Sequence, residues 1–131
     1  MSMFQLSVVS PDRIVVDEVA ESLVAPGVEG YFGILAGHEP FVSQLKIGAL
    51  KFRDAGGRDQ KVAVAGGFLE ASGDRVIVLA DAAERAEEID IERARAALER
   101  ARKRLEEKDV NIVRAQAAIE RALNRLKVAG A

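Results

Sequence analysis

The chain has no cysteine and no tryptophan, and it has a single histidine, His38, among its 131 residues. Without cysteine there is no disulfide framework and no thiolate metal site. One histidine cannot build a zinc site without carboxylate ligands, so we expect no metal site. No apolar run approaches the roughly 18 residues of a membrane-spanning helix. Residues 1–5 lack the basic and apolar regions of a signal peptide, so we expect the protein to stay on the side of the membrane where it is made.

Motifs of nucleotide hydrolases and of catalytic triads are also missing. A P-loop requires a lysine and a Ser or Thr after its last glycine, and Gly66-Gly67-Phe68 is followed by neither. His38 is followed by Glu39, but adjacent side chains of an extended segment point to opposite faces, so no Ser-His-Asp arrangement is indicated. Carboxylate pairs such as Glu87-Glu88 are typical of helix ends and surfaces. We therefore predict a non-catalytic protein, with no catalytic residues and no catalytic cofactor.

Residues 1–83 show the pattern of a β-sandwich or flattened barrel. Short segments rich in alternating or β-branched apolar residues predict strands at 4–9, 14–16, 19–25, 31–35, 46–52, 61–65, 68–71 and 75–80. Turn signals separate them, including Ser10-Pro11-Asp12, Pro26-Gly27 and the glycine-rich loop 54–59. Many short strands at close intervals are typical of an all-β domain.

Residues 84–131 show the pattern of a helical hairpin. No glycine or proline occurs from 84 to 127, where helix-favouring residues dominate. Apolar residues recur every three or four positions at Ile91, Ala94, Leu98, Ala101 and Leu105, and then at Ile112, Ile119, Leu123 and Leu126. The pattern breaks near 108–111, where Asp109 is expected to cap the second helix. So short a break predicts an antiparallel hairpin or one straight rod. The predicted fold class is a β-sandwich domain (1–83) followed by an α-helical hairpin (84–131), a segregated α+β arrangement.

Arginines on the two predicted helices share one spacing. Steps of seven and four residues separate Arg93, Arg100 and Arg104, and the same steps separate Arg114, Arg121 and Arg125. These steps return to nearly the same helical face, so each helix carries an arginine stripe. No acidic residue lies three or four positions from Arg100, Arg114, Arg121 or Arg125. Such a stripe favours a polyanion or an acidic protein surface; the alternative is a solvated face with partners distant in sequence.

The net charge of −2 hides an asymmetry between the two parts. Residues 1–83 carry 7 basic and 11 acidic side chains, which gives −4, and residues 84–131 carry 12 and 10, which gives +2. A nucleic-acid binder is one alternative for the basic part. Against it, glutamates dilute the arginine faces, aromatic residues are almost absent from the helices, and the whole chain is acidic. We therefore predict no nucleic-acid partner.

Three segments carry a resemblance to a known family. They are Glu29-Gly30-Tyr31-Phe32-Gly33-Ile34-Leu35-Ala36-Gly37-His38-Glu39-Pro40-Phe41, Val64-Ala65-Gly66-Gly67-Phe68-Leu69-Glu70 and Ala80-Asp81-Ala82-Ala83-Glu84-Arg85. Together with the order of the parts, they resemble the epsilon subunit of bacterial F-type ATP synthase. One departure is Ala36, where the family usually has proline.

The resemblance implies a rotor subunit, peripheral to the membrane at the cytoplasmic face of the bacterial plasma membrane. It implies that the sandwich binds the gamma subunit and the c-ring, with contact residues Glu29, Gly30, Tyr31, Phe32, Gly33 and His38. It also implies that the hairpin either folds against the sandwich or extends along gamma to the alpha and beta catalytic subunits. The resemblance implies that the extended hairpin inhibits ATP hydrolysis.

The resemblance further implies ATP as a regulatory ligand, with or without Mg. Some family members bind ATP through an Ile/Leu-Asp-x-x-Arg-Ala motif, which Ile89-Asp90-Ile91-Glu92-Arg93-Ala94 matches. The implied ATP-binding residues are Glu84, Ile89, Asp90, Arg93, Ala94, Arg100, Arg121 and Arg125.

An alanine-rich seam suggests a hairpin close to balance between two states. Burying an alanine contributes much less than the roughly 1.5–3 kcal/mol of a leucine. A ligand that binds only the folded hairpin shifts the balance by about 2.7 kcal/mol at a hundredfold excess over its Kd. The alternative is a protein-interaction module without a nucleotide role, whose arginines bind only an acidic partner surface.

Overall fold

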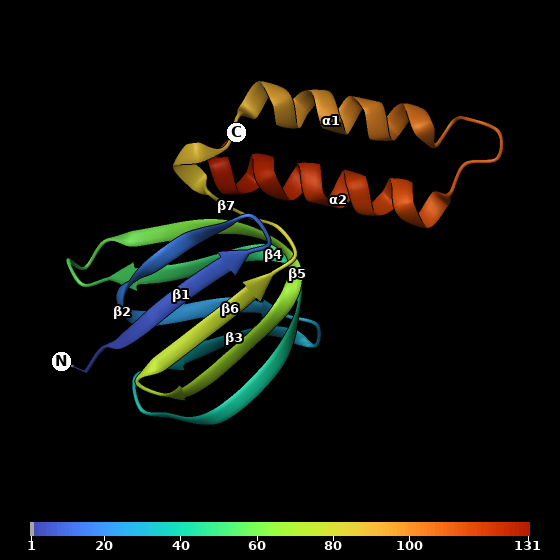
Figure 1. Ribbon diagram of the computed structural model, residues 1–131. Coiled ribbons are helices and arrows are strands. Elements are labelled where there is room, and N and C mark those ends of the chain that lie inside the picture. Colours follow the sequence, from blue (N-terminus) through green and yellow to red (C-terminus); the bar gives the residue numbers. More distant parts are fainter. Residues whose placement is uncertain (1) are drawn as a thin grey trace. The chain divides into compact units, whose positions relative to one another are not determined.

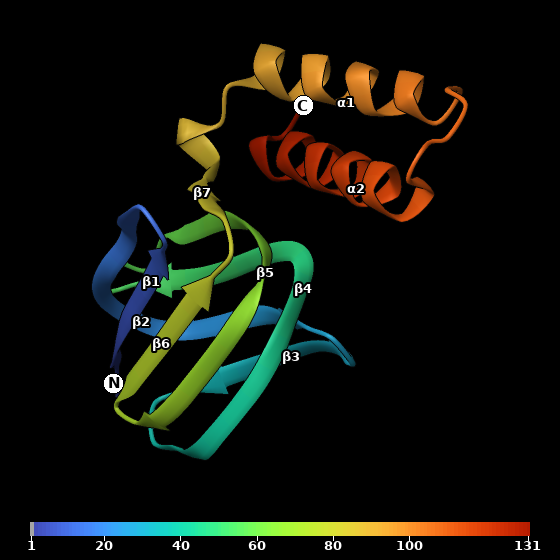
Figure 2. The same cartoon turned by 45° about the vertical axis from the view of Figure 1, so that its right-hand side comes forward.

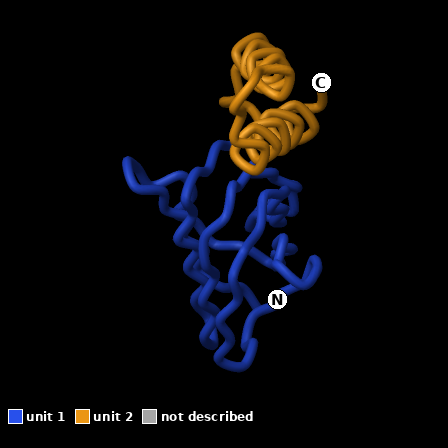
Figure 3. The backbone as a smooth tube through the Cα atoms, turned by 90° about the vertical axis from the view of Figure 1, so that its right-hand side faces the viewer, with its two compact units in different colours: residues 1–85 blue, residues 86–131 orange. Residues whose placement is uncertain are grey.

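The computed structural model describes residues 2–131, which form two compact units (Figures 1–3). The first unit ends at Arg85 and the second spans Ala86–Ala131. The elements follow as β1 (Phe4–Ser10), β2 (Arg13–Gly27), β3 (Gly30–Leu35), β4 (His38–Asp54), β5 (Asp59–Gly73), β6 (Arg75–Ala80), β7 (Ala83–Arg85), a 3-10 turn η1 (Ala86–Glu88), α1 (Ile91–Arg104) and α2 (Ile112–Ala129). The division into a strand-built part and a pair of helices confirms the predicted fold class.

The strands of the first unit close on themselves. Their order is β1-β6-β5-β4-β2-β3, β1 also pairs with β2, and β7 pairs with β5 (Figure 1). Each of the long strands β2, β4 and β5 contributes to two layers. Layer one contains β1, β6, the start of β2 and β4, and the end of β5, and layer two contains β3, β7 and the other halves of the long strands. This arrangement is the flattened barrel, or sandwich, that the strand pattern predicts.

The long strands differ from the shorter ones predicted. Segments 14–16 and 19–25 belong to one strand, β2, and the predicted strand 46–52 is part of β4, which begins at His38. Pro26-Gly27 was predicted to end a strand, yet both residues lie in β2, and the break falls at 28–29. The pairing of β2 with β4 shifts register between Val24 and Gly27. A bulge accommodates a proline because its missing N–H is not needed in the ladder.

The core of the first unit lies between the two layers. Alternating residues of β1 point into it, with Phe4, Leu6 and Val8 almost fully buried. Gly66 and Gly67 have positive φ angles of 86° and 123° where β5 crosses from one layer to the other. A Cβ on Gly67 would overlap the carbonyl oxygen of Leu79, so this crossing requires glycine.

Strand β7 was not predicted. Residues 83–85 pair with 62–64 of β5, and the guanidinium of Arg85 donates to the backbone oxygen of Val15 and to Glu18 at 3.0 Å. The first unit therefore ends two residues beyond the predicted boundary of 83/84.

Both helices of the second unit begin at a side-chain cap. The carboxylate of Asp90 accepts the N–H of Arg93 at 3.0 Å, and the side chain of Asn111 accepts the N–H of Arg114 at 3.1 Å. The prediction that Asp109 caps the second helix is wrong. Asp109 lies before the helix with φ 59°, a left-handed conformation that Asp tolerates better than most residues. Gly130 ends α2 with φ 80°, the usual glycine C-cap.

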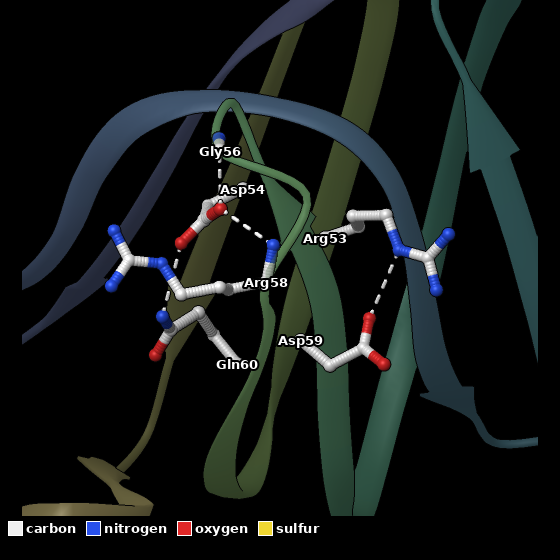
Figure 4. Close-up of polar contacts among 6 residues, drawn as sticks. All are labelled: Arg53, Asp54, Gly56, Arg58, Asp59 and Gln60. Carbon is white, nitrogen blue, oxygen red and sulfur yellow. Dashed lines mark hydrogen bonds and ion pairs between the residues drawn. The ribbon is translucent and has the colours of Figure 1, made fainter.

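The loop between β4 and β5 is held by one carboxylate (Figure 4). Asp54 accepts hydrogen bonds from the backbone N–H groups of Arg58 and Gly56 at 2.9 Å and from the side-chain amide of Gln60 at 3.1 Å. The N–H of Arg58 has the largest effect and Gln60 the next, and together they hold the pKa of Asp54 below its ordinary value.

Replacing this carboxylate should make stability depend differently on pH. A lowered folded-state pKa means that the ionised Asp54 stabilises the fold above the unfolded-state pKa of about 3.9, and that this contribution is lost as pH falls through the folded-state pKa. We expect Asp54→Asn to unfold at lower urea concentration than the wild type at neutral pH, and the difference to shrink in acid. Glu39→Gln, a change at an exposed strand position, is the control. A constant difference down to about pH 2 would contradict the assignment.

Candidate functional site

The hairpin is joined along a seam of small side chains. Ala94, Leu98 and Ala101 of α1 are buried, as are Ala115 and Ala122 of α2. Ala101 and Ala115 each lie seven residues from Lys108, the middle of the connection, and Ala94 and Ala122 each lie fourteen residues from it. In an antiparallel pair, equal distances from the turn place these alanines opposite one another in two levels.

An exposed arginine directly precedes each buried alanine of the seam, in the pairs Arg93-Ala94, Arg100-Ala101, Arg114-Ala115 and Arg121-Ala122. Successive residues of an α-helix are rotated by 100° about its axis. Each of these arginines is therefore displaced from the seam by the same angle and in the same sense. A two-fold rotation relates the two antiparallel helices, and it carries this angle to the same side of the hairpin. Arg104 and Arg125 follow at the same angle within about 40°. We call this surface the arginine side; its members are Arg93, Arg100, Arg104, Arg114, Arg121 and Arg125.

The opposite flank of the hairpin is electrostatically balanced. Arg95 forms an ion pair with Glu92 at 3.1 Å, and Arg102 lies 3.7 Å from Glu99. Helical rotation places Ala96, Ala97, Ala117 and Ala118 among the arginines of the arginine side, but no glutamate. Within residues 2–131 the side chains of Arg93, Arg100, Arg104, Arg114 and Arg121 form no ion pair. The arginine side therefore presents guanidinium groups over small side chains, a surface suited to an oxyanion.

Three residues of the predicted ATP motif have structural roles. Ile89 is buried and precedes the helix, Asp90 is its cap, and Ala94 belongs to the seam. Arg93 is exposed, and the helix directs it toward the arginine side. The motif therefore fixes where α1 begins, in addition to any contact with a ligand.

The predicted ATP-binding residues are only partly brought together. Because Ala94 lies opposite Ala122, Arg93 lies opposite position 123 of α2. Along the hairpin axis it is therefore between Arg121 and Arg125, across the seam from both. Arg100 lies about 10 Å farther along α1. Glu84 lies on β7, where it pairs with Ala63, and so belongs to the first unit.

Predicted contact residues of the sandwich surround β3. Glu29 is exposed in the turn before it, and Gly30 begins the strand with φ 134°. The hydroxyl of Tyr31 accepts the N–H of Ala49 at 3.1 Å, and the Nζ of Lys46 lies 5.7 Å from the centre of its ring. These bonds hold the side chain of Tyr31 over β4.

His38 lies at the other end of β3, beyond the following turn. Its Nδ1 is 2.7 Å from the backbone oxygen of Glu39, and its ring meets that of Phe41 edge to face at 5.5 Å. Phe32 contacts the same Phe41 ring at 5.2 Å. The six residues of β3 span about 20 Å, so Glu29 and His38 mark opposite ends of the predicted surface.

An exposed apolar row crosses layer one and was not among the predicted sites. Register places Ile14 beside Val9, Val9 beside Leu79, and Leu79 beside Phe68. Ile14, Leu79 and Phe68 are 64%, 59% and 55% exposed. We call these four residues the apolar row. The sequence signal was present, since segment 75–80 has apolar residues on both faces, as in a strand covered on both sides.

Two further features of the part of the chain that the structure describes concern metal sites and membrane-spanning helices. Within residues 2–131, no group of three His, Cys, Asp or Glu side chains could hold a metal ion. No helix in this range is long and apolar enough to cross a membrane.

Comparisons with known proteins cover both units. Residues 3–86 match the family described as "ATP synthase, Delta/Epsilon chain, beta-sandwich domain", and residues 87–130 match "ATP synthase, Delta/Epsilon chain, long alpha-helix domain". The ATP synthase epsilon chain of Carboxydothermus hydrogenoformans is 54% identical over 77% of this chain and 75% of its own length. That of Moorella thermoacetica is 47% identical over 82% and 81%.

Solved structures show the same fold. A chain in the Euglena gracilis mitochondrial ATP synthase, solved as OSCP/F1/c-ring, has a TM-score of 0.79 and 29% identity, covering all of this chain and 83% of that one. A chain of the Tetrahymena thermophila central stalk and c-ring has a TM-score of 0.61 at 13% identity, covering 96% of each.

The structural role of Asp90 can be separated from a ligand role. Asp90→Ala removes the cap and should cost the hairpin about 1 kcal/mol, because Ala cannot accept the N–H of Arg93. Asp90→Asn keeps a capping oxygen and should preserve the helix. Hydrogen exchange of the first turn of α1 measures this difference. Equal loss of protection in both variants would show that the charge of Asp90, and not its capping oxygen, holds the turn.

Proposed function

The chain belongs to the delta/epsilon family of F-type ATP synthase subunits, and from that premise we propose that it is a rotor subunit whose hairpin responds to ATP. As a central-stalk subunit it is part of the complex, and its own role is regulatory and mechanical, not catalytic. It is a peripheral protein located at the cytoplasmic face of the bacterial plasma membrane. The single observation that carries the regulatory role is the arginine side of the hairpin.

The sandwich is the part that docks in the stalk. The apolar row is a surface for the gamma subunit, since exposed Ile14, Leu79 and Phe68 would be covered by a protein partner. The turn at Glu29, which Tyr31 holds by its bond from Ala49, is directed to the c-ring. The loop at His38, beyond the other end of β3, is the second part of the sandwich that we expect to face the c-ring.

The hairpin is the part that binds ATP. Guanidinium groups recognise phosphate through paired hydrogen bonds. Arg93 lies between Arg121 and Arg125 along the hairpin axis, so three guanidinium groups are close together there. The alanines around them leave room for a flat base. A bound nucleotide, with or without Mg, bridges arginines of both helices and so favours the folded hairpin.

ATP then acts on a weakly held element. Each buried alanine methyl contributes only about 0.8 kcal/mol. Of the larger seam side chains, Leu98 is buried, and Ile91, Ile119 and Leu126 are only half-buried. A ligand at a hundredfold excess over its Kd adds about 2.7 kcal/mol to the state that binds it. With ATP scarce, the hairpin opens along gamma to the alpha and beta subunits and inhibits hydrolysis.

Calorimetric titration of the isolated protein with ATP tests this role. We expect saturable binding by the wild type, and a roughly tenfold weaker Kd in Arg93→Ala and in Arg125→Ala, as for the loss of one charge-assisted bond. Arg95→Ala and Arg102→Ala are matched controls, because they remove arginines from the opposite flank.

A wild type that releases no heat up to millimolar ATP would rule out the sensor. A second function would then remain: a hairpin whose arginines bind an acidic protein surface. The structural roles of Ile89, Asp90 and Ala94 favour it, because they explain most of the motif without a ligand.

The docking surface is tested by charge insertion on the two layers. Leu79→Asp should weaken binding of purified gamma subunit by at least about tenfold, because a carboxylate would be buried at the centre of the apolar row. Val24→Asp, at an exposed position of layer two next to Lys51, should leave binding nearly unchanged. The reverse result would move the gamma surface to layer two.

A further inference from the structure

The arginine side divides into two groups of three arginines. One group has one arginine from α1 and two from α2, and the other has two from α1 and one from α2. In the levels set by the alanine pairs, Arg93 of α1 lies between Arg121 and Arg125 of α2. By the same two-fold relation, Arg114 of α2 lies between Arg100 and Arg104 of α1. We call the second group the loop-end triad. The triad centres are about 13 Å apart along the hairpin, from the rise of 1.5 Å per residue.

The loop-end triad differs from the other triad in the acidic residues of the helix start beside it. It stands beside the start of α2, where the helix dipole is positive and the first turn has no acidic residue. The first turn of α1, near the other triad, carries Glu92 and the Asp90 cap. The side chains of Arg100, Arg104 and Arg114 are exposed and form no ion pair within residues 2–131.

The connection between the helices contains acidic side chains, but they do not pair with the arginines of the loop-end triad in the described chain. Glu106, Glu107 and Asp109 are exposed, and none forms an ion pair with a triad arginine in the described chain. Three like charges gathered on adjacent turns repel one another, and neither the seam nor the cap at Asn111 requires an arginine at 104 or 114.

We propose that the loop-end triad is a second anion site, which takes inorganic phosphate or diphosphate. The inference goes beyond the nucleotide role, since Arg104 and Arg114 are outside the predicted ATP set and only Arg100 belongs to both. A diphosphate is too short to span about 13 Å, so it occupies one triad at a time. Two or three guanidinium groups on one phosphate give the paired, charge-assisted bonds that distinguish such a site from diffuse attraction.

Titration of the full chain with diphosphate, and separately with phosphate, tests the proposal by NMR of the arginine Nε–H groups. The Arg114 signal should shift and saturate, with diphosphate binding more tightly than phosphate. Arg114→Ala and Arg114→Gln should each weaken the Kd read from Arg100 and Arg104 by about tenfold. Arg102→Ala, an ion-paired neighbour on the same helix, should change it less than twofold.

The outcomes separate this proposal from the ATP role. Equal weakening by Arg102→Ala, or shifts confined to Arg93, Arg121 and Arg125, would overturn the second site. Absence of ATP binding with a saturating Arg114 signal would overturn the nucleotide role and leave the second site standing. ATP binding with a silent Arg114 signal would do the opposite.

Discussion

The close packing of alanine against alanine is the constraint on which the hairpin depends. The two helices meet along four buried alanines and Leu98, while Ile91, Ile119 and Leu126 are half-buried beside them. Such a seam contributes little apolar burial for its length, and helices of 14 and 18 residues are marginal alone in water. The caps at Asp90 and Asn111 therefore matter more here than in a helix with a large apolar face.

The same seam dictates where the arginines lie. Since each buried alanine follows an arginine, the spacing that buries one exposes the other on a fixed side. A sequence optimised only for hairpin stability would place glutamates among these arginines, as it does at Glu92 and Glu99 on the other flank. The concentration of charge on one side is thus a local conflict with stability, the pattern expected where a surface serves a partner or ligand.

Helical periodicity predicted this part well because its interactions are local. The two helices, the alanine seam and the arginine stripes all follow from a 3.6-residue period. The cap was wrong because both Asp109 and Asn111 are capping residue types, and only the backbone conformation, with Asp109 left-handed, selects between them. That all six arginines lie on one side also required the hairpin to be antiparallel, which the sequence left open.

The strands were harder to predict because their continuity depends on contacts distant in sequence. β1 and β6 are short and regular, and their bounds came out within a residue. β2, β4 and β5 continue through Pro26, Pro40 and Gly66-Gly67, residues that locally indicate a break. Bulges and the crossing between layers accommodate these residues, and β7 exists only because β5 offers it a free edge.

Each unit carries a surface that is unusual for a protein that functions alone, and the two surfaces differ in chemistry. Layer one leaves large apolar side chains in water across four adjacent strands. In the hairpin, Arg93, Arg100, Arg104, Arg114 and Arg121 form no ion pair within the described residues 2–131. The first defect is relieved by a protein surface, because apolar area gains most from dry contact. The second is relieved by an anion or an acidic surface, because guanidinium groups gain most from oxygen acceptors. The proposed rotor subunit, with a docked sandwich and a ligand-responsive hairpin, accounts for both surfaces.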